Sequence, residues 1–534
     1  MPFAPPPPTP AILLIGAQVW VDNGKSAAEK PGWAVLVQGS RIQAVGPEAT
    51  LRQEHPEAQI ISLPGGTLLP GLIEGHTHVE EVGTLHREVG LERVSGPGEA
   101  LRKIRAWAND HPEGWILGRG WDQNRWGSKN FPRASDLDAA IGSRPAALTR
   151  VDGHAMWVNT AALNLAGITR ETPDPAGGQI LRNGQGEPNG ILLDSAVELV
   201  KAKIPHPSGT EREARVLDGL HQMKEFGYTT VVDMGIDKEG LEIYRRLESS
   251  GTLPIRVFAY LSHDPVLMKA ELAKPRERDL GFFQVQGVKF YLDGALGSRG
   301  ARLLTPYSDA PGHHGIWVTQ PSLVKIGVTQ TLRAGYQPAI HAIGDAANRA
   351  ALDLLKGLPK STLLPRIEHA QIVEAGDAKR FGALGAIASI QPIHCASDHP
   401  WTPALLGPAR VKEAYPWRTF LQGGALLALG TDAPNDDLNP YAGLAAAETR
   451  QDADGQPAGG FLPEHRLTRE EALRGFTWAN GRALGAHDLG ILRAGAVADL
   501  LWVEADLSKI SAPALRKLRP GRLWVNGLEV KLNH

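Results

Sequence analysis

Eight short apolar runs, spread over the middle of the chain, constrain its fold more than any other feature. Amphipathic, helix-like stretches separate several of them, for example residues 211–227 and 345–357. Apolar strands that alternate with helices are typical of a parallel sheet, and eight of them fit a closed barrel. The sequence therefore predicts an α/β fold of the (β/α)8 TIM-type barrel class. The eight runs are 66–78, 228–235, 255–262, 285–294, 337–345, 366–372, 386–394 and 425–433.

The two ends of the chain carry a different pattern. Short runs rich in Val and Ile, punctuated by Gly, Asn and Pro, predict a small antiparallel unit near each end. These runs are 11–21, 33–46, 58–71, 495–505 and 521–530. We expect one small β-sandwich built from both chain ends, in which residues 1–68 and 485–534 flank a barrel of residues 69–484.

A long insertion is predicted after the first barrel strand. The gap to the second strand spans about residues 80–225, which is far too long for one helix. Connections of this length are either functional or carry structure of their own. This gap contains two tryptophan-bearing blocks, GRGWDQNRW and VDGHAMWVN.

Composition excludes several classes of function. The 534 residues carry a formal net charge of −2, which gives no electrostatic case for nucleic acid or an anionic membrane as a partner. The single cysteine, Cys395, excludes an internal disulfide and a cysteine zinc finger, and we expect a buried structural thiol. No run has membrane-spanning length, and the opening MPFAPPPPTP lacks the features of a signal peptide. We expect a cytoplasmic protein that acts on a small-molecule substrate, with a homodimer as the base-rate expectation.

Polar side chains close five of the eight predicted strands. In a barrel of this class the catalytic groups lie at the carboxyl ends of the strands, so side chains at these positions converge. In an extended strand, residues i and i+2 face the same way, which points the two histidines of a His-x-His pair at one place. The six residues at these strand ends are His76, His78, Lys289, His341, His369 and Asp432.

Each of these residues also has a structural interpretation. One His-x-His pair is expected by chance about 0.6 times in a chain with this many histidines, so the pair alone is a weak motif. Lys289 would be a strand-end lysine that reaches water, and Asp432 a turn or helix-capping aspartate. The common placement of the six residues favours a functional site. Residues with unrelated structural roles would not all be expected at the same end of one barrel.

The residue types fit a metal centre. Imidazole suits Zn²⁺, and a carboxylate adds charge and a hard oxygen ligand. Two ions about 3.5–4 Å apart would hold a bridging hydroxide and lower its pKa toward neutrality. A lysine that loses its proton near such ions can react with CO₂, and the resulting carbamate offers one oxygen to each metal.

Five ordered motifs carry a resemblance to a known family. The segments LPGLIEGHTH, VKFYLDGALGS, HAIGD, RIEHA and LGTDAP resemble the amidohydrolase superfamily. More narrowly, the chain is similar to the YtcJ-like branch, amidohydrolase family 3, which includes N-substituted formamide deformylases. The resemblance covers essentially the whole chain, including the bracketing β segments and the blocks of the insertion.

The resemblance implies a ligand for each strand-end position. His76 and His78 match the ligands of a more buried divalent ion, and His341 and His369 match those of a second ion. Lys289 matches the residue that is carboxylated and bridges the ions in many binuclear relatives. Asp432 matches the aspartate that binds metal and also acts as the catalytic proton carrier. The expected cofactor is one or two divalent metal ions, with Zn²⁺ favoured, and an N6-carboxylysine at Lys289.

Further polar and aromatic residues in the family-like blocks are predicted to bind substrate or to form the pocket wall. Each of them also has a structural alternative: Trp121, for example, would also pack the insertion, and Asp293 would also fix a turn. These residues are Trp121, Asp122, Asp152, His154, Asp293, His394 and Asp398.

The function that follows is a metal-dependent hydrolase of C–N bonds. We expect it to cleave an amide or N-acyl bond, with N-formyl compounds among the candidates, through a metal-bound hydroxide. The 13 tryptophans, several of them in the insertion, would suit a small and partly apolar substrate. The same metal site would also serve an esterase, a lactonase or a phosphotriesterase. A deaminase and a non-catalytic binding protein are less favoured, the latter because no ligand position is broken.

Overall fold

The structure is a computed structural model, and its chain divides into two compact units. One unit joins Met1–Val82 to Val216–His534, and the other is Gly83–Arg215. We refer to them as the barrel unit and the insertion unit. The residues that the structure describes are 10–92, 94–123, 126–128, 130–151, 155–175, 178–194, 196–276, 280–297, 299–358 and 361–533.

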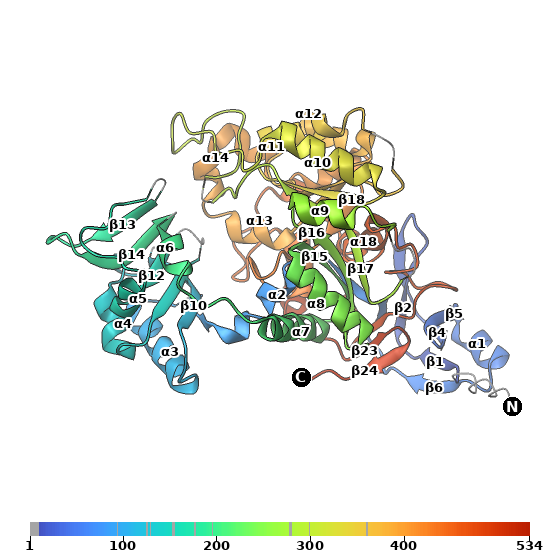
Figure 1. Ribbon diagram of the computed structural model, residues 1–534. Coiled ribbons are helices and arrows are strands. Elements are labelled where there is room, and N and C mark those ends of the chain that lie inside the picture. The colour runs from blue at the N-terminus through green and yellow to red at the C-terminus, as the bar shows by residue number, and fades with distance from the viewer. Residues whose placement is uncertain are drawn as a thin grey trace. The chain divides into compact units, whose positions relative to one another are not determined.

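An eight-stranded parallel sheet forms the centre of the barrel unit (Figure 1). Its strands follow one another in chain order, which is the arrangement that repeated β-strand and helix units produce. Every one of the eight predicted apolar runs contributes a strand, so the predicted barrel fold is confirmed. The strands are β8 (Leu72–Thr77), β15 (Tyr228–Ile236), β16 (Arg256–Leu261), β17 (Phe283–Tyr291), β18 (Gln337–Ala342), β19 (Arg366–His369), β20 (Ile387–Ile390) and β21 (Leu427–Leu429).

Backbone hydrogen bonds join the first and last strands of this sheet near their carboxyl ends. The amide of Asp432 donates to the carbonyl of His76 at 2.7 Å, and the amide of His78 donates to the carbonyl of Ala433 at 2.9 Å. The buried carboxylate of Glu74 accepts the amides of His76 and Thr431, at 2.9 and 2.8 Å. These contacts bring the first and eighth strand ends together, where the predicted ligands lie.

Helices follow the barrel strands. Helix α8 (Lys238–Ser249) shows why they form: the side chain of Asp237 caps its first turn by accepting the amide of Gly240 at 2.8 Å. Leu241, Tyr244 and Leu247 recur every three residues and are buried, which places them on one face of the helix. Within the described ranges, no helix is long and apolar enough to span a membrane. The helices are α2 (Val79–Val82), α7 (Gly209–Glu225), α8 (Lys238–Ser249), α9 (Pro265–Glu271), α10 (Pro321–Arg333), α11 (Asp345–Leu355), α12 (Ala375–Leu384), α13 (Pro392–Asp398), α14 (Thr402–Arg410), α15 (Trp417–Gln422), α16 (Pro440–Thr449), α17 (Arg469–Gly475) and α18 (Trp478–Ala483).

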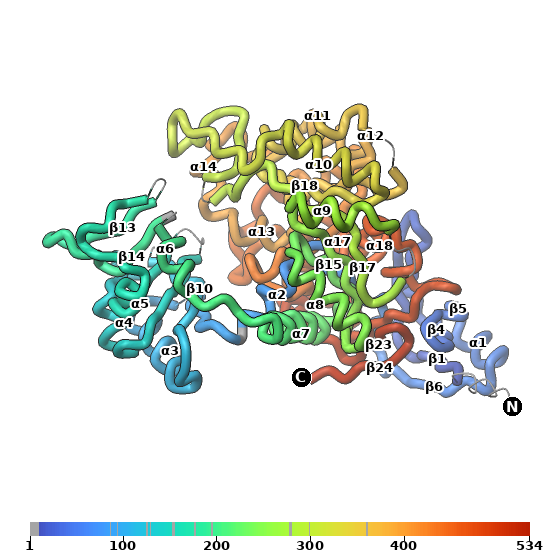
Figure 2. Tube along the Cα trace, in the orientation of Figure 1, coloured from blue at the N-terminus to red at the C-terminus, as the bar shows by residue number. Residues whose placement is uncertain are grey.

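The two ends of the chain form a β-sandwich, as predicted. One sheet has the order β5-β4-β1-β6 and the other β24-β23-β22-β7-β2-β3, so C-terminal strands join N-terminal ones in the second sheet. Figure 2 shows the C-terminal strands β23 and β24 in red at the C-terminal end of the trace. The strands are β1 (Ile12–Ile15), β2 (Gln18–Asp22), β3 (Ala27–Lys30), β4 (Trp33–Gln38), β5 (Arg41–Pro47), β6 (Gln59–Ser62), β7 (Thr67–Pro70), β22 (Leu500–Val503), β23 (Arg522–Val525) and β24 (Leu528–Val530).

The prediction that these strands are all antiparallel was wrong. Strand β1 pairs with β6 in parallel, and β2 pairs with β7 in parallel. A parallel pair needs a long connection, and the intervening strands and helix α1 (Glu48–Glu54) supply it. Side chains of both sheets meet in one buried core that includes Leu14, Leu68 and Trp524.

The insertion unit is built on its own six-stranded mixed sheet, of order β13-β14-β12-β11-β10-β9. Two buried clusters pack against this sheet, one rich in tryptophan and one in aliphatic side chains. The elements are β9 (Val89–Gly90), α3 (Pro97–Asp110), β10 (Ile116–Trp121), α4 (Ala134–Ile141), β11 (Ala146–Arg150), β12 (Ala155–Val158), α5 (Thr160–Leu165), β13 (Gly178–Arg182), β14 (Pro188–Asp194) and α6 (Val197–Lys201).

Candidate metal centre

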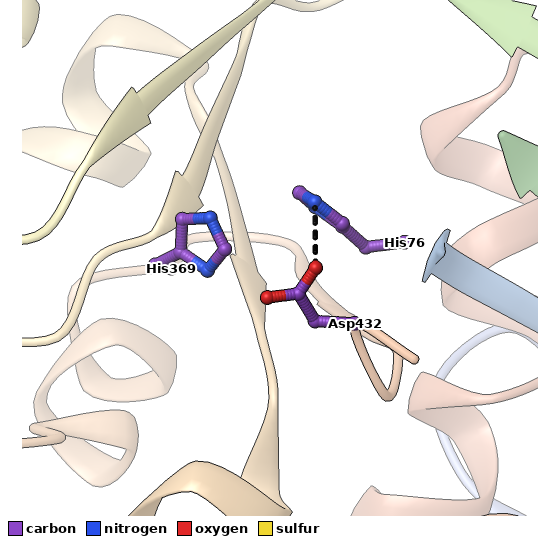
Figure 3. A group of neighbouring side chains, drawn as sticks. All are labelled: His76, His369 and Asp432. Atoms are coloured by element: carbon purple, nitrogen blue, oxygen red, sulfur yellow. Dashed lines mark ion pairs between the residues drawn. The ribbon is translucent and has the colours of Figure 1, made fainter. Parts of the chain in front are cut away.

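Three buried side chains form a compact group at the carboxyl ends of the barrel strands. One possible ligand atom from each of His76, His369 and Asp432 lies within 4.8 Å of the other two. Figure 3 shows the two imidazoles on either side of the carboxylate. His76 lies near the end of β8, His369 ends β19, and Asp432 lies just after β21. Residues far apart in sequence are thus brought to one point by the barrel.

Two of these three residues have a left-handed backbone. The φ angles are 72° at His369 and 60° at Asp432. A positive φ is uncommon for residues other than glycine, and such strain persists where the surrounding structure fixes it. The local strain therefore lies at the proposed ligands.

The other predicted ligands lie beside this group. His78 Nε2 is 3.3 Å from Asp432 Oδ1, and His76 Nε2 is 3.4 Å from the same oxygen. Lys289 Nζ is 3.1 Å from His76 Nε2. The ring of His341 is 4.5 Å from that of His369, measured between centroids. The structure therefore brings together all six residues that the strand-end argument selected.

Three of the four predicted histidine ligands are held in the neutral state that metal binding requires, whereas the contact with Asp432 raises the pKa of the fourth, His78. Burial, with the positive charge of Lys289, lowers the pKa of His76 to about 4 and that of His341 to about 3. Burial and the neighbouring His341 hold the pKa of His369 well below its usual range. A neutral imidazole has a free nitrogen lone pair at neutral pH, so none of these three must lose a proton before it binds an ion.

The pKa values of the two charged groups at the site, Asp432 and Lys289, are also shifted. Burial alone would raise the pKa of Asp432, but the neighbouring imidazole of His76 and the contact with His78 hold it well below its usual range. Burial lowers the pKa of Lys289 to about 8, while the carboxylates of Glu368 and Asp432 oppose that change. The centre thus holds one carboxylate ready to bind a cation and one amine that loses its proton more readily than usual.

Two buried atoms lack a partner that a metal ion would supply. Among the described residues, His341 Nε2 and Asp432 Oδ1 are buried and have no hydrogen-bond partner. An unsatisfied buried polar atom is costly, so each calls for a ligand. Imidazole nitrogens with a carboxylate oxygen are a donor set that suits Zn²⁺ and related divalent ions. The residues present therefore fit a divalent metal ion.

Asp293 is buried beside His341 and braces two loops. Its carboxylate accepts the amides of Arg302 at 2.8 Å, Ile343 at 3.0 Å and Gly344 at 2.8 Å. Oδ1 also lies 3.6 Å from His341 Nε2. These contacts tie the segment after β17 to the segment after β18. The position favours a bracing role, and the predicted substrate contact stays a prediction.

His394 and Asp398 both lie in helix α13 (Pro392–Asp398). The sequence instead predicts a strand over residues 386–394, which would include His394. Strand β20 ends at Ile390, and α13 begins at Pro392, a residue that suits the first turn of a helix. His394 Nε2 lies 3.6 Å from Asp432 Oδ2, so it borders the metal centre. Asp398 accepts hydrogen bonds from the hydroxyl of Tyr415 and, at 3.1 Å, from the side-chain amide of Gln371. Substrate binding by either residue stays a prediction.

The remaining predicted pocket residues belong to the insertion unit. Trp121 is fully buried, donates to the carbonyl of Leu148 at 2.7 Å, and packs against Trp126 and Trp157. These tryptophans form part of the core of that unit, which favours the packing interpretation. Asp122 pairs with Arg150 at 2.5 Å. The predicted sites at Asp152 and His154 lie outside the described residues.

Sequence reasoning missed two polar residues that contact the ligands. Glu368 Oε2 is 2.7 Å from His76 Nδ1, and Gln391 Oε1 is 2.9 Å from His369 Nδ1. The available signal was the pair of charged residues Arg366 and Glu368 in a predicted barrel strand, because charged residues are rarely buried unless they are paired. For Gln391 no comparable signal exists.

Comparisons with known proteins agree with this geometry. The family model described as Amidohydrolase family matches residues 59–530, and one described as Imidazolonepropionase-like composite domain, bacteria, matches residues 34–58. The chain is 34% identical to Protein LONG AFTER FAR-RED 3 of Arabidopsis thaliana, over 88% of this chain and 83% of that protein. It is 26% identical to the N-substituted formamide deformylase of Arthrobacter pascens, over 97% of each chain.

A solved structure shares the fold. The crystal structure of an uncharacterized metal-dependent hydrolase from Pyrococcus furiosus superimposes with a TM-score of 0.77 and 26% identity, and covers 93% of this chain and 100% of that one. The family match extends over the whole barrel sheet and over sandwich strands β6, β7 and β22 to β24, and the buried His76, His369 and Asp432 lie close enough together to hold one ion. The chain belongs to the amidohydrolase family, in the branch that its motifs predicted, and is a metal-dependent hydrolase.

Proposed function

We propose that this hydrolase cleaves a C–N bond, in an amide or N-acyl compound of small size and partly apolar character. The observation that carries the proposal is the convergence of His76, His369 and Asp432 within 4.8 Å, with Lys289 beside them. This donor set suits hydrolysis with an activated water rather than with a side-chain nucleophile. Cys395, the single cysteine, is fully buried, and burial raises its thiol pKa to about 12, so it is not a candidate nucleophile.

The residues of the centre would have two roles, metal binding and proton transfer. His76, His78, His341 and His369, with Asp432, would hold the metal. When bound, a divalent ion would lower the pKa of a water molecule and polarise the carbonyl of the substrate. Asp432 would accept the proton that this water loses, because its carboxylate is kept ionised and Oδ1 has no hydrogen-bond partner.

A nitrogen leaving group makes the return of that proton necessary. An amine anion is a poor leaving group, so the nitrogen must be protonated as the C–N bond breaks. Asp432 would deliver the proton it has taken up, acting first as a general base and then as a general acid. His394, with Nε2 at 3.6 Å from Asp432 Oδ2, borders the same carboxylate and would orient it toward the leaving nitrogen.

We further propose that Zn²⁺ is the metal, and that Lys289 is carboxylated when two ions are bound. The lysine is buried within the ligand group, with Nζ at 3.1 Å from His76 Nε2. Its neutral amine would attack the carbon of CO₂, form an N–C bond and release one proton, and so become an anionic carbamate. A carbamate would supply two oxygen ligands where the unmodified ammonium supplies none.

The substrate class draws support from one relative. The Arthrobacter pascens protein is named as an N-substituted formamide deformylase, and its match extends over 97% of both chains. An N-formyl group on a nitrogen that carries an apolar substituent is therefore our first candidate substrate. The buried tryptophans of the insertion unit do not add to this argument, since they pack together in its core.

A panel of chromogenic substrates tests the proposal. Protein loaded with Zn²⁺ would be assayed on N-formyl and N-acetyl anilides, a carboxyl ester, a lactone and a phosphotriester, with D432N as the inactive control. We expect amine release from the anilides, lost in D432N. Ester, lactone or phosphotriester cleavage without amine release would overturn the C–N assignment. Equal rates for D432N and the wild type would overturn the assigned site.

A further inference from the structure

The imidazole of His76 is bound on its far side by a buried carboxylate. Nδ1 of His76 lies 2.7 Å from Oε2 of Glu368, and both side chains have 0% exposure. Glu368 belongs to β19 and His76 to β8, which are not neighbours in the barrel sheet. Their contact therefore crosses the barrel interior. A carboxylate accepts hydrogen bonds and does not donate, so Nδ1 of His76 must carry the proton.

A buried arginine fixes the carboxylate. Nε of Arg366 donates to Glu368 Oε1 at 2.8 Å, and Nη2 donates to Oε2 at 3.2 Å. Nη2 also donates to the carbonyl of Gly75 at 2.6 Å and to the hydroxyl of Ser389 at 2.8 Å. Arg366 and Glu368 are two residues apart on β19, so both point to the same face of the strand. The carboxylate is therefore held by its own strand, while Arg366 also reaches the β8 residue that precedes His76.

We propose that Glu368 is a positioning residue that holds His76 in the Nδ1–H tautomer and presents Nε2 to the metal ion. The proposal rests on the metal centre of the proposed function and extends it to a residue outside the ligand set. With Nδ1 protonated, Nε2 carries the lone pair, and this atom faces Lys289 Nζ at 3.1 Å and Asp432 Oδ1 at 3.4 Å. A fixed ring and tautomer remove the need to reorganise when the ion binds.

The other central histidine has a different partner, which makes the centre asymmetric. Nδ1 of His369 lies 2.9 Å from Oε1 of Gln391, a neutral amide. A charged acceptor strengthens the hydrogen bond and raises the basicity of the ligating nitrogen, whereas a neutral amide does so less. His76 is therefore the stronger donor of the two, and the charge on Glu368 sets this difference.

Metal affinity measured by competition with a chelator tests the charge of Glu368. The variant E368Q keeps the shape and a carbonyl acceptor but removes the charge. We expect the dissociation constant for Zn²⁺ to rise by about 10- to 100-fold, as for other carboxylate partners of ligating histidines. The matched control is E271Q, because Glu271 of helix α9 is also buried and also pairs with an arginine, Arg245 of helix α8, at 2.6 Å. E271Q is expected to leave the dissociation constant unchanged within about twofold.

A second measurement keeps the proposal testable if E368Q folds poorly. Nitrogen NMR of wild-type protein labelled in histidine and stripped of metal reports which ring nitrogen of His76 carries the proton, with H76Q used to assign the signal. We expect the Nδ1–H tautomer, and the Nε2–H tautomer would overturn the role of Glu368. Wild-type protein that takes up no divalent ion would overturn the proposed function and this role with it. Wild-type protein that binds Zn²⁺ with the same affinity as E368Q would overturn the role alone.

Discussion

Lys289 and His76 meet inside the barrel, with Nζ of the lysine 3.1 Å from Nε2 of the histidine. The contact involves the same nitrogen that Glu368 leaves free to bind a metal. A protonated lysine therefore competes with the ion for one lone pair, whereas a carbamate on the same lysine would bind the ion. In the proposed centre, the chemical state of Lys289 would therefore control how many metal ions bind.

Replacing Lys289 by methionine tests this relationship. We expect K289M to hold fewer metal ions per chain than the wild type and to lose at least about 100-fold in kcat/KM, because it would lack the ligand that we propose to bridge two ions. Metal content is measured by elemental analysis after dialysis against Zn²⁺. Lys224, which is also largely buried and donates to the carbonyl of Lys531, provides the control K224M. A K289M protein with wild-type metal content and rate would show that the lysine is not a ligand.

The change of Asp432 to asparagine separates proton transfer from folding. The backbone at Asp432 has a φ of 60°, a conformation that asparagine tolerates better than most residues. We therefore expect D432N to fold normally, with the wild-type circular dichroism spectrum, while kcat falls by about 10²- to 10⁴-fold, the usual contribution of a general acid–base group. The variant D432A would add backbone strain and a further loss of thermal stability. A D432N enzyme within tenfold of wild-type kcat would argue against a proton-carrying role.

The barrel could be predicted from sequence because its signal is local. Each predicted strand is a mainly apolar run that ends at a glycine, a proline or a polar residue. The polar residues at these ends are the predicted metal ligands. The error at residues 392–394 has the same local origin: the isoleucine after Pro392 continues the apolar pattern, although the proline begins helix α13. The pairing of β1 with β6 could not be predicted, because strand partners are chosen by tertiary packing.

The contacts around the ligands depend on residues far apart in the chain. Glu368 and His76 are separated by 292 positions, so only the closed barrel shows that the glutamate binds the histidine. The left-handed backbone at His369 also cannot be seen in the apolar pattern of the sequence. Composition likewise does not distinguish a tryptophan in a core from one in a pocket, and Trp121 belongs to a core.

The variant W121F tests that packing interpretation. It removes the indole N–H that donates to Leu148 at 2.7 Å and leaves a smaller ring among Trp126 and Trp157. We expect the insertion unit to lose about 1–3 kcal/mol of stability, from one buried hydrogen bond and reduced packing. KM for the best anilide substrate should stay within about twofold of the wild type. Thermal unfolding and steady-state kinetics measure both quantities, and a large rise in KM at unchanged stability would favour the pocket-wall prediction.

Cys395 should be inert in the native protein. The side chain is fully buried in helix α13, and burial raises its thiol pKa to about 12. Because the thiolate is the reactive form, an aromatic disulfide reagent is expected to react with none of the native protein and with one thiol per chain after unfolding in guanidinium. Rapid reaction of the native protein would mean that α13 opens readily, and would reopen the question of a reactive thiol beside His394.

Asp233 should make stability depend on pH in a direction opposite to that of most carboxylates. The side chain is buried beside β8, where Oδ2 accepts the hydroxyl of Tyr244 at 2.6 Å and Oδ1 accepts the amide of Val79 at 3.1 Å. Burial raises its pKa from 3.8 to about 6, so the folded protein holds the proton more tightly than the unfolded chain. Stability from this group is present below pH 3.8 and is lost as the pH rises through about 6.

The variant D233N checks the sign of this effect. Its amide oxygen would still accept from Val79, and its NH₂ group would donate to the oxygen of Tyr244. Relative to the wild type, we expect D233N to gain up to about 3 kcal/mol of unfolding free energy between pH 4 and pH 7, because the wild type must ionise a buried carboxyl over this range. Urea unfolding at several pH values measures the difference. In Y244F the carboxylate loses a hydrogen bond that lowers its pKa, so the pH-dependent loss of stability should extend to higher pH. A difference between D233N and the wild type that does not vary with pH would contradict the raised pKa of Asp233.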